Sequence, residues 1–105
     1  MIKDNDGRFY FGFWDGMPYK SKTDSFEDFA NYKNSISKAT VIQHIETLDP
    51  GLACAFSTDI FTGETFNAGI YWDEDFTFPV DFLRYYKTQD IGIPYEYEEY
   101  LKTVL

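Results

Sequence analysis

The chain has 105 residues, a formal net charge of −9 and an aromatic content of 21%. This length corresponds to a single domain, residues 1–105, with one modest core. The acidic balance disfavours binding to nucleic acid or to anionic membranes and favours a basic protein partner. No apolar run is long enough for a membrane span, and the first residues lack the apolar region of a signal peptide, so we expect a cytoplasmic protein.

The N-terminal segment predicts a hairpin. Arg8–Trp14 alternates as a strand does, with Phe9, Phe11 and Phe13 on one face. Asp15-Gly16 is typical of a two-residue hairpin turn. Met17–Lys20 would then return as a short edge strand, because Pro18 has no N–H to donate.

Two helices are predicted next. Asp24 is placed to cap the first, with Glu27 three residues later as in a capping box. Ser37 is placed to cap the second, which covers residues 38–48. Asp49-Pro50-Gly51 ends it, because proline and glycine both interrupt a helix.

The C-terminal half predicts a second hairpin and two more helices. Leu52–Phe61 and Thr65–Trp72 are the strands, and the residues between them form a glycine-containing turn. Helices follow over Pro79–Lys87 and Tyr95–Val104. The chain is therefore predicted to be an α+β domain, with a small antiparallel sheet of about four strands in two hairpins packed with three to four helices. A largely helical fold with one hairpin is the alternative.

The sequence offers no recognisable catalytic, metal or cofactor site. His44 is the only histidine and has no nearby nucleophile, so we interpret it as a surface or boundary residue. Cys54 lies in a small apolar run, which predicts a buried, inert thiol. The adjacent acids of residues 73–75 lack the spaced oxygens of a Ca²⁺ or Mg²⁺ loop. We therefore expect a protein that is not an enzyme and that needs no cofactor.

Acidic and aromatic residues cluster in the C-terminal half, which points to recognition of a partner. Residues 49–105 contain 11 acidic and 3 basic side chains, against 7 and 6 in residues 1–48. Binding hot spots are rich in Trp and Tyr, and charged rims accelerate association. The predicted partner-binding residues are Tyr71, Trp72, Asp73, Glu74 and Asp75 in an acidic turn, with Glu96, Glu98 and Glu99 of the last helix as a second contribution. The alternative is that Trp72 is a core residue, the turn is merely solvated, and the glutamates stabilise their helix.

The same half resembles the small immunity proteins of bacterial polymorphic and contact-dependent growth inhibition toxin systems. The resemblance covers about residues 65–101 and is carried by Gly69-Ile70-Tyr71, Asp75–Pro79, Phe82–Tyr86, Ile93-Pro94 and Tyr97. It implies a cytoplasmic inhibitor that binds a toxin domain, often a nuclease, and has no catalytic activity. A phage-type inhibitor that mimics nucleic acid and blocks a host defence nuclease is the first alternative. A non-catalytic adaptor domain is the second, and a small enzyme using carboxylates is a further one.

Overall fold

The structure, a computed structural model, describes residues 1–105 and contains one mixed sheet of five strands. The strand order is β1-β2-β5-β4-β3. Neighbouring strands are antiparallel except β2 and β5, which run parallel. The strands are β1 (Ile2–Lys3), β2 (Phe9–Tyr10), β3 (Gly51–Thr58), β4 (Thr65–Asp73) and β5 (Phe76–Pro79).

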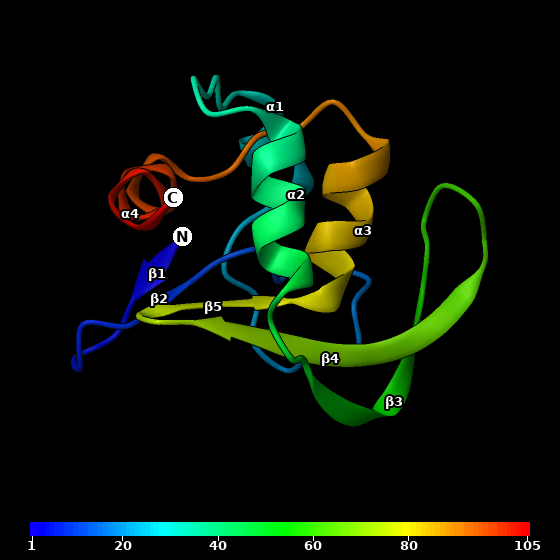
Figure 1. The fold of residues 1–105 in the computed structure, drawn as a ribbon. Helices are drawn as coiled ribbons and strands as arrows, with labels where there is room; N and C mark the ends of the chain where they lie inside the picture. The colour runs from blue at the N-terminus through cyan, green and yellow to red at the C-terminus, as the bar shows by residue number, and fades with distance from the viewer.

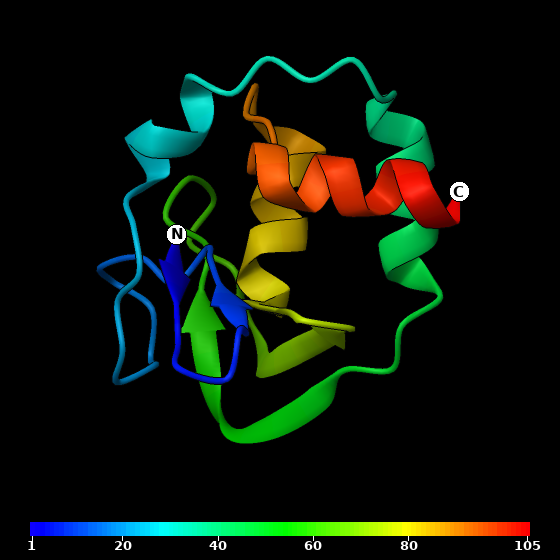
Figure 2. The same ribbon diagram turned by 90° about the vertical axis from the view of Figure 1, so that its left-hand side faces the viewer.

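Four helices complete the fold and confirm the predicted α+β class. They are α1 (Phe26–Ala30), α2 (Lys38–Glu46), α3 (Val80–Thr88) and α4 (Tyr95–Val104). Figure 1 shows α2 and α3 standing on one side of the sheet, with α4 on the same side beyond the end that carries β1 and β2. Figure 2 shows α1 and the loop that follows it, which crosses the top of the helices to reach α2. None of the helices combines the length and apolar character that crossing a membrane requires.

The core between the sheet and the helices is built from aromatic rings. Phe11, Phe78, Phe82 and Tyr97 are fully buried and come from the loop after β2, from β5, from α3 and from α4. The Phe11 ring stacks on Phe78 with centroids 4.8 Å apart and meets the Phe82 ring edge-on at 5.2 Å. Such ring pairs contribute about 0.5–1.5 kcal/mol beyond their area burial, so the high aromatic content is used largely inside the molecule.

The predicted N-terminal hairpin is wrong. The strand ends at Tyr10, because Gly12 adopts a φ of +83° that turns the chain, and a Cβ there would press against Phe82 and Pro79. Phe11 and Trp14, predicted on opposite faces, consequently lie in the same core. The partner of β2 is β1 rather than residues 17–20.

The helix predictions are correct in position. Ser37 caps α2 by accepting a hydrogen bond from the Thr40 N–H at 3.1 Å, and α4 has the predicted bounds. The first helix begins one residue later than predicted, because Ser25 is the N-cap and Asp28 completes the capping box. Asp24 instead accepts a hydrogen bond from the Gly12 N–H at 2.9 Å and pairs with the terminal ammonium group.

The second hairpin is formed by β3 and β4, and a strand that was not predicted, β5, follows it. The register of β3 against β4 shifts between Leu52 and Phe56, and both of these side chains project into solvent at this free edge of the sheet. Cys54 lies within the shifted segment and is exposed, so the predicted buried thiol is wrong. Side chains on both faces of β3 are exposed in this segment. A short apolar run usually indicates a buried strand, so the sequence did not predict this exposure.

Candidate functional site

The predicted acidic turn is the tight connection between β4 and β5. Strand β4 extends to Asp73, one residue further than predicted, and Asp73 pairs with Phe76 across the hairpin. Only Glu74 and Asp75 remain in the turn, and both are exposed. Glu74 has a φ of +51°, in the left-handed region that two-residue hairpin turns use. The Asp75 carbonyl accepts a hydrogen bond from the Phe9 N–H at 2.7 Å, which ties the turn to β2.

Asp73 is not part of the exposed acidic surface. It is 5% exposed, and its Oδ2 contacts His44 Nε2 at 2.8 Å and accepts a hydrogen bond from the Tyr97 hydroxyl at 2.7 Å. The Tyr100 hydroxyl donates to Oδ1 at 3.1 Å. The carboxylate therefore fastens the base of the turn to α2 and α4, and His44 is a boundary residue with a structural partner.

The two tyrosines act as hydrogen-bond donors throughout the neutral pH range. Burial, together with the hydrogen bond to Asp73, raises the pKa of Tyr97 well above its usual value. Burial and the negative charge of Asp73 raise the pKa of Tyr100 to about 12. Both hydroxyls consequently keep their protons, as the network around Asp73 requires.

Glu98 is also absent from the exposed surface. Its Oε2 accepts hydrogen bonds from the Ser35 N–H at 2.7 Å and the Ile36 N–H at 3.0 Å, and its Oε1 accepts one from Asn34 Nδ2. Burial opposes ionisation of Glu98, but these hydrogen bonds outweigh it and lower the pKa of the carboxyl group. Glu98 thus fixes the loop before α2 to α4.

The ring of Tyr71 is buried on the helical side of the sheet, whereas that of Trp72 lies on the opposite face. Tyr71 packs against Phe78 at 5.5 Å between centroids. Trp72 is 52% exposed and lies over Gly51 of β3, so that a Cβ on Gly51 would overlap the indole. This alternation along β4 decides which predicted residues reach solvent.

Five of the eight predicted partner-binding residues are therefore exposed: Trp72, Glu74, Asp75, Glu96 and Glu99. Tyr71, Asp73 and Glu98 are buried and are corrected to structural residues. The hydrogen bond from Tyr100 to Asp73 holds α4 against the end of β4, and Figure 1 shows α4 on the same side of the molecule as the β4–β5 turn. We refer to Trp72, Glu74, Asp75, Glu96 and Glu99 as the acidic surface.

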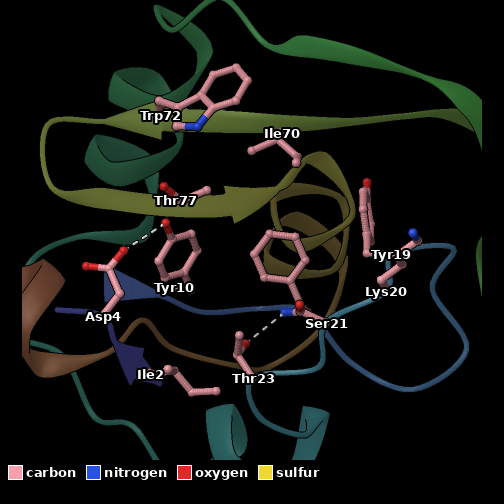
Figure 3. A pocket seen from close by; sticks show the side chains of 11 residues that line it. Ile2, Asp4, Tyr10, Tyr19, Lys20, Ser21, Thr23, Ile70, Trp72 and Thr77 are labelled. Atoms are coloured by element: carbon pink, nitrogen blue, oxygen red, sulfur yellow. Dashed lines mark hydrogen bonds between the residues drawn. The ribbon is translucent and has the colours of Figure 1, made fainter. Parts of the chain in front are cut away.

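A pocket adjoins this surface on the sheet face that carries no helix (Figure 3). Its volume is about 490 Å³. The strand register sets Tyr10, Thr77 and Trp72 side by side across β2, β5 and β4, and all three line the pocket. No sequence motif indicates this pocket, because it depends on β5 and on the parallel pairing of β5 with β2.

The site contains no arrangement of His, Cys, Asp and Glu side chains, in groups of three or more, that could hold a metal ion. His44, the residue closest in type to a catalytic base, is turned toward Asp73. The exposed features here are two carboxylates on a tight turn, a half-exposed indole, and a mostly apolar pocket that the indole lines. Comparison of the chain with family models, with curated proteins and with solved structures finds no match.

Proposed function

We propose that this chain is an immunity protein that binds and neutralises a cognate basic toxin domain, a nuclease, and catalyses no reaction itself. The observation that carries the proposal is the presentation of Glu74 and Asp75 on a two-residue turn next to the half-exposed ring of Trp72. A nuclease uses basic side chains to hold phosphates. Two carboxylates at a fixed position offer those side chains an alternative anionic partner.

The turn is ordered before a partner arrives. Asp73 at its base is bonded to His44, Tyr97 and Tyr100, and the Asp75 carbonyl is bonded to the backbone of β2. Ordering a loop during association costs free energy, so a preorganised turn supports tighter binding than a flexible one. An acidic turn that served only solubility would not need such an anchored base.

The other members of the acidic surface support the same role. Trp72 provides a large, partly exposed ring of the type that dominates binding energy at interfaces. Glu96 and Glu99 extend the negative field along α4. A field of this sign accelerates the approach of a basic partner and is weakened by salt.

The proposal is tested by co-purification with the protein encoded immediately upstream, followed by binding kinetics at low and high salt. The turn variant carries Glu74→Lys and Asp75→Lys. The control carries Glu27→Lys and Asp90→Lys, exposed acids outside the acidic surface, and changes the net charge equally.

We expect the turn variant to lower the association rate on the order of tenfold at low salt and to flatten its salt dependence, with a smaller effect in the control. Trp72→Ala should mainly raise the dissociation rate. Equal effects of the two charge variants would mean that only net charge matters. If neither variant changed binding, the acidic surface would not be part of the interface.

A further inference from the structure

The pocket on the open face of the sheet has the size and composition of a ligand site. Its volume of about 490 Å³ lies within the range of small-molecule pockets, roughly 300–1,000 Å³. Ile2, Phe13, Ile70 and the rings of Tyr10 and Trp72 supply mostly apolar walls. Figure 3 shows Ile2 of β1, Tyr10 of β2, and Ile70 and Trp72 of β4 around the pocket, and Phe13 of the loop after β2 also lines it, so the fold assembles the pocket from distant segments.

One polar group in this wall has no partner. Thr77 is 3% exposed, and its Oγ1 is buried and forms no hydrogen bond with the rest of the chain. A buried hydroxyl without a partner is unfavourable, because nothing replaces the hydrogen bonds to water that it loses on burial. The register explains its position, because the side chains of Tyr10 and Trp72 flank Thr77 on either side.

The charged groups that line the pocket are either bonded within the chain or exposed to water. Asp4 and Lys20 both line the pocket, but the Asp4 carboxylate already accepts hydrogen bonds from the Tyr10 hydroxyl and from the backbone N–H groups of Asp6 and Arg8. Lys20 is exposed, so water screens its charge, and an ionic ligand would lose hydration with little compensation from the mostly apolar walls.

From these observations we propose that the pocket binds an uncharged, planar aromatic group that carries one hydrogen-bonding atom for Thr77. Such a group is either a free phenol- or indole-like molecule or a Tyr or Trp side chain of a protein partner. The ring lies between the apolar walls beside Trp72, and its polar substituent bonds to Oγ1, which a rotation about the Thr77 Cα–Cβ bond presents to the pocket. This inference does not depend on the proposed function, since its test uses the isolated chain.

The test is an NMR titration of the full chain with p-cresol and with toluene, two probes that differ only by a hydroxyl group. We expect saturable shifts at Tyr10, Ile70, Trp72 and Thr77, with p-cresol binding roughly two- to tenfold more tightly than toluene. In Thr77→Val this preference should disappear while toluene binding is retained. Thr65→Val, on an exposed position of the same sheet, is the matched control and should leave both affinities unchanged.

Thr77→Val should fold, because it removes a hydroxyl that has no partner, and thermal unfolding verifies this. Trp72→Ala gives a second readout: both probes should weaken while their ratio is retained. Absence of saturable shifts at the pocket in the unmodified chain overturns the proposal. Tighter binding of benzylamine than of toluene, or an unchanged p-cresol preference in Thr77→Val, overturns the assigned ligand chemistry.

The two sources are distinguished with N-acetyl-tyrosine amide. If this compound binds as tightly as p-cresol, the pocket admits a ring that is attached to a peptide backbone, which assigns it to a side chain of a protein partner. If it is excluded while p-cresol binds, the pocket is assigned to a free small molecule.

Discussion

Removal of the Tyr97 hydroxyl should weaken the anchoring of the acidic surface and lower stability. Tyr97 is fully buried, and its hydroxyl donates to Asp73 Oδ2 at 2.7 Å. Tyr97→Phe retains the ring and its packing but leaves Asp73 with two partners instead of three. A hydrogen bond to a charged group contributes about 1.5–3 kcal/mol. We therefore expect a loss of about 2 kcal/mol in the free energy of unfolding, or roughly 10 °C in Tm for a domain of this size.

Tyr86→Phe is the matched control. Tyr86 is 2% exposed, but no hydrogen bond within the chain contributes to its raised pKa, which is caused mainly by burial. Loss of the Tyr86 hydroxyl should change the free energy of unfolding by no more than about 0.5 kcal/mol. Urea denaturation followed by circular dichroism measures both variants, with equal m-values as the condition for comparison.

If Tyr97→Phe destabilises the chain no more than Tyr86→Phe does, the hydrogen bond to Asp73 does not anchor the turn. A double-mutant cycle adds a second criterion: in an Asp73→Ala background, Tyr97→Phe should lose most of its effect, because its partner is already gone. If the two substitutions were additive, the hydroxyl would stabilise the chain through another contact.

Three further predictions concern other parts of the molecule. Because the pKa of Glu98 is lowered in the folded chain, its stabilising effect is complete above its ordinary value of 4.5 and is lost as the pH falls through the lowered pKa. Urea titrations should therefore show a large stability difference between the native chain and Glu98→Gln at pH 7 that narrows steadily below about pH 4.5; a constant difference would contradict this. Cys54 should react fully with Ellman's reagent without denaturant, whereas a reaction that needs denaturant would show it to be covered. Gly51→Ala should displace the Trp72 ring and shift its fluorescence to the red, with no shift when the substitution is made in Trp72→Phe.

Local patterns predicted the helices well, because their signals lie within a few residues. The Ser37 cap and the apolar spacing of α4 are examples, and both agree with the structure. The second hairpin was also predictable from alternation. The strand β5 was not, because Phe76–Pro79 is short and ends in a proline that directly precedes α3. Its place in the sheet depends on pairing with β2, which is more than sixty residues away in the sequence.

The candidate site was only half predictable for a similar reason. The prediction placed residues 73–75 in a turn, where all three acids would be exposed. In the structure β4 is one residue longer and includes Asp73, whose side chain therefore points toward the helices. The groups that hold it there, His44, Tyr97 and Tyr100, lie 24 to 29 residues away. Glu98 was misassigned in the same way, since the backbone N–H groups that bind it precede α2. In both cases a buried carboxylate has the sequence context of an exposed one.

The outer edge of β3 bears on how copies of the chain behave toward each other. Residues 50–58 contain no charged side chain, and a flat, apolar edge of this kind would be a template for aggregation. The register shift between Leu52 and Phe56 interrupts the row of backbone groups that a second strand would need. The net charge of −9 keeps copies apart at neutral pH. As the pH falls toward the isoelectric point of about 4.3 this repulsion weakens, and the register shift in β3 still limits edge-to-edge pairing of copies.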